Sequence, residues 1–174
     1  MRTIRLLSMA AALVATMSVS CFDPVHADQV AALGPEVPGV PEGKFHRAGQ
    51  PCRTCHGGDG PGDPEWSIAG TVYRVRGEPT AIDAVRVIVR DSSAPAAERT
   101  LTSNAVGNFY IAMGDWSPTF PVFVRLEYGE GPTLRTAEML TPIGRNGGCN
   151  FCHYGADNEP THMPPVFLAM TPFQ

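Results

Sequence analysis

The chain is short of charge and of long apolar runs. Its 174 residues include 13 Lys and Arg against 17 Asp and Glu, so 17% are charged and the net charge is −4. No basic patch is available for phosphates, which argues against a nucleic-acid partner. The longest apolar run, from Leu6 to Val19, is about 14 residues, too short to span a bilayer.

Helix-favouring sequence is also scarce. Gly and Pro, 18 and 17 residues, together make up about a fifth of the chain. This content falls short of a disordered low-complexity chain but predicts many turns and little helix. The length suits one domain with two short appendages.

The start of the chain has the pattern of a secretory signal. Arg2 and Arg5 precede the apolar run Leu6 to Val19. We therefore expect an exported protein of the periplasm, outer membrane or cell surface.

Two cleavage sites compete. A signal peptidase would cut after Ala27, removing residues 1–27. The alternative is a lipoprotein signal of residues 1–20, with Cys21 as the acylated first residue and membrane anchor, although Ser18 stands where Leu is usual. The lipoprotein alternative is favoured because it accounts for a fifth thiol, and only it retains His26.

Residues 21–43 are rich in Pro and Gly from Gly34 onward. Such a composition cannot sustain a helix, so Asp28 to Gly43 is expected to be an extended tether.

The pattern CxxCH occurs twice, as Cys52-Arg53-Thr54-Cys55-His56 and as Cys149-Asn150-Phe151-Cys152-His153. In this pattern two thiols add to the vinyl groups of a haem and the adjacent imidazole ligates the iron. A zinc site built from two CxxC pairs is the alternative, but zinc does not need a His after each pair.

On these two motifs the chain resembles a small multihaem c-type cytochrome of bacterial type. The resemblance implies two covalently attached haems c, one on Cys52 and Cys55 and one on Cys149 and Cys152. His56 and His153 would be the proximal metal ligands.

The sixth iron ligands are less closely defined by the sequence. His46, ten residues before His56, and His162, nine residues after His153, are the leading candidates. Met163 is an alternative at the second motif, and His26 remains open. The haem-binding segments are assigned to residues 44–66 and 144–174, both largely irregular.

Between these segments, residues 67–143 alternate with a period of two. Strands are expected at Thr71 to Arg76, Val85 to Arg90 and Val122 to Tyr128, with turn residues between them. The pattern predicts a mainly β protein with an Ig-like or prealbumin-like antiparallel β-sandwich. The strings at Ala69–Val72, Ala84–Val87 and Gly107–Ile111 resemble carboxypeptidase-regulatory-like domains.

The sandwich suggests where the motifs lie. With an odd number of strands its ends emerge at opposite poles, about 20 Å apart. Two distant haems would pass electrons between molecules, which predicts end-to-end self-association.

The expected function is electron transfer with redox partner proteins, and no nucleophile and base indicate catalysis. The alternatives are a haem peroxidase or reductase, or a haem-based sensor or adhesion module, each of which needs an open iron site.

Overall fold

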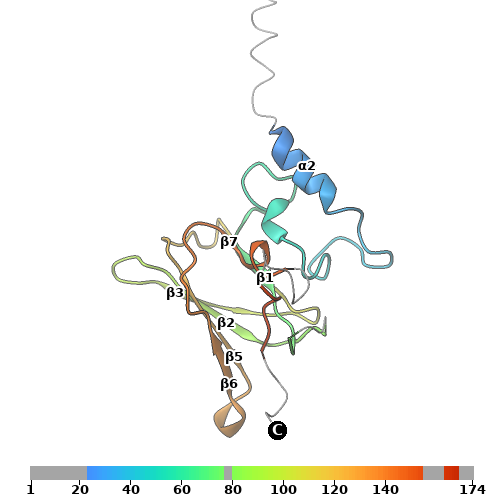
Figure 1. Cartoon of the computed structure of the whole chain (residues 1–174). Coiled ribbons are helices and arrows are strands. Elements are labelled where there is room, and N and C mark those ends of the chain that lie inside the picture. Colours follow the sequence, from blue (N-terminus) through green and yellow to red (C-terminus); the bar gives the residue numbers. More distant parts are fainter. Residues whose placement is uncertain (1–22, 77–79, 155–162, 169–174) are drawn as a thin grey trace, which may run out of the picture.

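A computed structural model describes residues 23–76, 80–154 and 163–168 (Figure 1). The signal sequence, Cys21 and His162 lie outside these residues. The described elements are α2 (Pro24–Ala32), η2 (Cys52–Thr54), β1 (Trp66–Thr71), β2 (Arg86–Arg90), β3 (Glu98–Thr102), β4 (Asn108–Ala112), β5 (Phe123–Tyr128), η3 (Gly131–Thr133), β6 (Arg135–Glu138), β7 (Gly147–Gly148) and η4 (Cys149–Phe151).

The strands form two sheets packed together in a sandwich-like arrangement. One sheet has the order β4-β1-β7 and the other the order β3-β2-β5-β6. All pairs are antiparallel except β1 with β7. The prediction of a mainly β protein is confirmed at this level.

The core lies between the sheets, where alternate residues of β2 and β5 point inward. Val87 and Val89 of β2 are fully buried, and their register partners on β5 are Leu126 and Val124. The predicted inward face of Val122 to Tyr128 is confirmed, because its four apolar members all belong to the core or pack against it. Period-two alternation of apolar and polar residues located these strands, and in β2 Ile88, on the face opposite Val87 and Val89, is also buried.

The first predicted strand was misplaced. It was expected at Thr71 to Arg76, but β1 begins at Trp66 and ends at Thr71. All six residues of β1 are buried, so the strand shows no alternation between buried and exposed positions. Because β1 is covered on both faces, its sequence does not alternate between apolar and polar residues, and alternation could not locate it.

The described part of residues 144–174, the segment predicted to bind the second haem, belongs to the sandwich and is not an appendage. Gly147 and Gly148 pair with Ile68 and Ala69 of β1, and Leu168 is buried in the core. A Cβ atom at Gly147 would overlap the backbone oxygen of Ser67, so only glycine permits this pairing.

The extended tether predicted for residues 21–43 is wrong in its first part. Residues Pro24–Ala32 form helix α2, whose first turn is capped by the Asp23 carboxylate accepting from the backbone N–H groups of Val25 and His26. The glycines and prolines used to exclude a helix begin only at Gly34, which follows the helix with a φ of +70°. Within the described residues, no helix is both long and apolar enough to cross a membrane.

Candidate functional site

The two motifs fold into the same local turn. In the first, η2, the N–H groups of Cys55 and His56 donate to the Cys52 carbonyl at 3.2 and 2.9 Å. In the second, η4, the N–H groups of Cys152 and His153 donate to the Cys149 carbonyl at 3.2 and 3.0 Å. The two CxxCH strings therefore adopt one backbone arrangement at two sites.

Both motif histidines are held by a proline carbonyl. His56 Nδ1 lies 3.0 Å from the Pro64 oxygen, and His153 Nδ1 lies 2.8 Å from the Pro164 oxygen. A carbonyl oxygen only accepts, so Nδ1 carries the proton in each ring and Nε2 has the free lone pair. A histidine that binds a metal through Nε2 donates its Nδ1–H to such an acceptor, which fixes the tautomer and the ring orientation.

The His56 ring is the end of a stack of three parallel aromatic rings. His56 and Trp66 are 3.8 Å apart at an angle of 3°, and Trp66 and Tyr110 are 4.4 Å apart at 7°. Burial lowers the pKa of His56, which favours the neutral ring that a metal requires. The stack restricts the rotation of the ring about its bond to the backbone.

His46 faces His56 across a cavity of about 720 Å³ that both line. Their ring centres are 5.9 Å apart. Two imidazole nitrogens bound in line to one metal ion, each at about 2 Å, put the ring centres roughly 6 Å apart. The tertiary structure thus brings together the two histidines that the sequence paired.

The Nδ1 atom of His46 lies 3.5 Å from Glu36 Oε1, and it has no hydrogen-bond partner. Glu36 is held in turn by Arg47, whose Nε donates to the same oxygen at 2.7 Å. Arg47 also donates to the carbonyl groups of Leu33 and Gly34, so it joins the end of α2 to this cavity.

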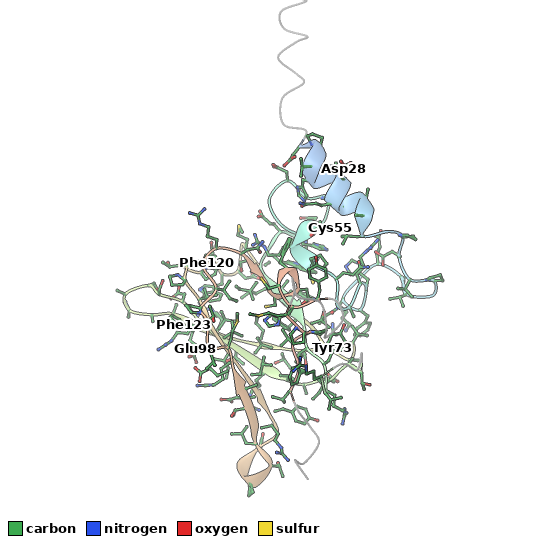
Figure 2. All side chains as sticks on the ribbon, viewed as in Figure 1. Asp28, Cys55, Tyr73, Glu98, Phe120 and Phe123 are labelled. Carbon is green, nitrogen blue, oxygen red and sulfur yellow. The ribbon has the colours of Figure 1, made fainter. Side chains whose placement is uncertain are left out.

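His26 is engaged elsewhere. Its Nε2 donates to the Thr54 carbonyl at 2.6 Å and so ties α2 to the first motif. Figure 2 shows Cys55 in the turn beside α2. His26 does not line the cavity that contains His46 and His56.

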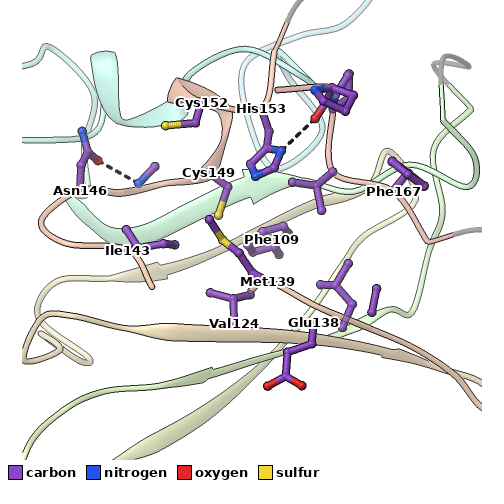
Figure 3. A pocket seen from close by; sticks show the side chains of 16 residues that line it. Phe109, Val124, Glu138, Met139, Ile143, Asn146, Cys149, Cys152, His153 and Phe167 are labelled. Atoms are coloured by element: carbon purple, nitrogen blue, oxygen red, sulfur yellow. Dashed lines mark hydrogen bonds between the residues drawn. The ribbon is translucent and has the colours of Figure 1, made fainter. Parts of the chain in front are cut away.

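The second motif borders a smaller cavity of about 210 Å³, shown in Figure 3. Its lining is mostly apolar and includes Cys149, Cys152 and His153. Met163 is 51% exposed and is not among the lining residues, and His162 lies outside the described residues. Met139 does line the cavity, but it follows β6 and is 14 residues before His153, so the sequence near the motif gives no signal for it.

The prediction that the motifs lie far apart is wrong. η2 and η4 both pack on β1 (Figure 1). Arg53 of the first motif donates to Asn146, just before the second motif, at 2.9 Å. An odd number of strands was taken to put the two motifs at opposite poles. That inference was wrong because β7 pairs in parallel with β1 and brings the C-terminal motif beside the N-terminal one.

Three of the four motif cysteines are shielded from solvent at least in part, whereas Cys152 is exposed. Burial raises the pKa of Cys52 to about 11 and that of Cys149 to about 12, and a neighbouring thiolate raises each further, Cys55 for Cys52 and chiefly Cys52 for Cys149. All four motif cysteines are unpaired in the described residues. In the same part of the chain no three His, Cys, Asp or Glu side chains converge as metal ligands.

A comparison of the chain with protein-family models, with curated proteins and with solved structures finds no match.

Proposed function

We propose that the protein is a di-haem c-type cytochrome that transfers electrons in the cell envelope. The observation that carries the proposal is the pair of motif histidines, each with its Nδ1 proton donated to a proline carbonyl and its Nε2 free. The same device at two motifs far apart in sequence is expected when both rings serve the same purpose, the binding of a metal at Nε2.

The residues suit a covalently attached haem at each motif. Cys52 and Cys55 would hold the first haem and Cys149 and Cys152 the second, with His56 and His153 as proximal iron ligands. When bound, each haem supplies one iron that alternates between the ferric and ferrous states. The protein holds the ring, orients the imidazole and limits access of water.

His46 is proposed as the sixth ligand at the first motif. Its ring centre is 5.9 Å from that of His56, and Glu36 Oε1 lies 3.5 Å from its Nδ1 without a hydrogen bond between them. A carboxylate behind a ligating imidazole fixes the ring orientation and increases its basicity. An iron with both axial positions filled by protein exchanges electrons and does not bind substrate.

The contact between the motifs supports relay within one molecule. Both turns pack on β1, and Arg53 bridges them through Asn146. End-to-end association was predicted because the motifs were expected to lie far apart, and the structure removes that reason. Redox partner proteins remain part of the proposal because neither donor nor acceptor is part of the chain.

The β-sandwich is proposed as a scaffold similar to carboxypeptidase-regulatory-like domains. Its edge strand β7, which pairs with β1, leads directly into the second motif. No role in catalysis is assigned to it.

We propose export with retention of α2, and so a lipid anchor at Cys21. Cleavage after Ala27 would cut α2 between its fourth and fifth residues and remove both the Asp23 cap and the His26 bond to Thr54. Figure 2 labels Asp28, the residue that would follow this cleavage site, within the helix.

The test is to express the full-length chain in a host that matures c-type cytochromes and to measure mass and haem content. Two haems per chain are expected, falling to one when Cys52 and Cys55 are both changed to Ser. The matched control, Cys21→Ser, should keep two. A colourless chain that weighs only what its amino acids add up to would overturn the proposal.

Carbon monoxide then separates electron transfer from catalysis and sensing. Two low-spin haems that do not bind the gas support relay. Binding by the unmodified protein would favour the haem enzyme or sensor, since both need an open iron position.

A further inference from the structure

The cavity at the second motif is lined by a methionine, Met139, that lies outside both CxxCH motifs. Met139 follows the last residue of β6, and its backbone N–H donates to the Val124 carbonyl at 3.0 Å. Ala137 and Met139 are two residues apart and both line the cavity. The backbone bond therefore directs Met139 to the side of the strand that faces the second motif.

Figure 3 shows the Met139 side chain extending towards Cys149, with the His153 ring on the other side of that cysteine. Phe109 and Val124 close the inner end of the cavity, so the methionine lies on an apolar wall. A thioether in apolar surroundings is a soft ligand that loses little hydration when it binds iron.

The other polar side chains of the lining are less suited to iron. Asn146 Oδ1 already accepts from Gly148 N and from Arg53. Glu138 is exposed, and Figure 3 shows its carboxylate turned away from the motif. Among the lining side chains this leaves Met139 as the candidate opposite His153.

We propose that Met139 is the sixth ligand of the iron at the second motif. This inference rests on the proposed function and deepens it. The first iron would be held by two imidazoles and the second by one imidazole and one thioether. Methionine ligation raises the reduction potential, so electrons would run from the first motif to the second within one molecule.

Four variants of the full-length holoprotein test the inference. Met139→Leu should abolish the near-infrared charge-transfer band of sulfur-ligated ferric haem, lower the higher of the two potentials and let one carbon monoxide bind per chain. Met139→His should keep both haems low-spin while lowering that potential. Met163→Leu is the matched control, because it removes an exposed methionine beside the same motif, and it should change none of these readings.

His162→Gln distinguishes the rival ligand, and it should leave the band and the potentials unchanged. The inference is overturned if the unmodified protein lacks the band, or if His162→Gln opens the second iron while Met139→Leu does not. Haem content is measured on every variant. An unmodified chain that contains no haem would refute the proposed function. An unmodified chain with two haems but without the near-infrared band would refute the Met139 assignment alone.

Discussion

Thr71 and Asn150 are joined by two hydrogen bonds in the middle of the molecule. The Asn150 Oδ1 accepts from the Thr71 backbone N–H at 3.0 Å, and the Asn150 Nδ2 donates to the Thr71 hydroxyl at 3.2 Å. The same hydroxyl accepts from Gly49 N and donates to Asn108 Oδ1, both at 2.8 Å. One threonine at the end of β1 thus connects the segments that carry both motifs.

Replacing this hydroxyl with a methyl group should destabilise the fold. Thr71→Val leaves three polar groups, on Gly49, Asn108 and Asn150, without a partner, and we expect a loss of about 2–3 kcal/mol in the free energy of unfolding. Urea unfolding measures it. Thr102→Val, at an exposed position on β3, is the control and should change stability by less than about 0.5 kcal/mol. Equal stability of the two variants would contradict the role given to Thr71.

Removing His46 should open the first iron. We expect His46→Gly to give a high-spin component and to bind one carbon monoxide per chain, because no other described residue of the cavity lining offers an imidazole opposite His56. Added imidazole should restore the low-spin spectrum by entering the space left by the side chain. His26→Ala is the control: it removes the bond to Thr54 but should leave the spectrum unchanged. An unaltered spectrum in His46→Gly would refute the ligand assignment.

Trp66 should control the orientation of the His56 ring. With Trp66→Leu the stacked ring is lost, and we expect the low-spin electron paramagnetic resonance signal of the first iron to shift or broaden. Trp66→Phe retains a flat ring and should restore most of the original signal. Trp116→Leu removes a buried tryptophan of the core and should lower stability without moving the signal. If all three variants give the signal of the unmodified protein, the stack does not control the orientation of the His56 ring.

Asp91 should make stability depend on pH in the acid range. Its carboxylate accepts from the Ser93 hydroxyl at 2.6 Å and from the N–H groups of Ala97 and Thr119, which lower its pKa to about 2. The folded pKa is below the unfolded value of about 3.9, so this stabilisation is complete above pH 4 and is lost as the pH falls towards 2. Asp91→Asn should flatten unfolding free energy against pH in that window.

The control for this pH measurement is Asp83→Asn, at an exposed turn position, which should preserve the slope. Chemical unfolding between pH 2 and pH 5 provides the comparison. A slope that persists unchanged in Asp91→Asn would assign the pH dependence to another group.

The mature chain should begin at Cys21. Intact-mass analysis of membrane-extracted protein is expected to give the mass of residues 21–174 plus two haems and a lipid, and Cys21→Ser should abolish the lipid. The physical reason is that α2 packs on the first motif through His26 and Thr54. A soluble product starting at Asp28 would contradict this expectation.

The sequence by itself determined the two CxxCH motifs, the scarcity of helix and the strands whose residues alternate, because these properties depend on residues close together in the chain. It also singled out His46. It could not determine the position of β1, since a strand buried on both faces carries no alternation, nor helix α2, whose short stretch precedes the glycines and prolines that were used to exclude it.

Only the tertiary structure decided that the two motifs lie side by side and that Met139 lines the second cavity. Both facts arise from strand pairing between distant parts of the chain: β7 with β1, and β6 with β5. Such pairing is selected by the packing of whole sheets, to which each residue contributes little. The local sequence pattern therefore specifies the chemistry of each motif. Long-range packing specifies that the two motifs are neighbours and which other side chains lie beside each of them.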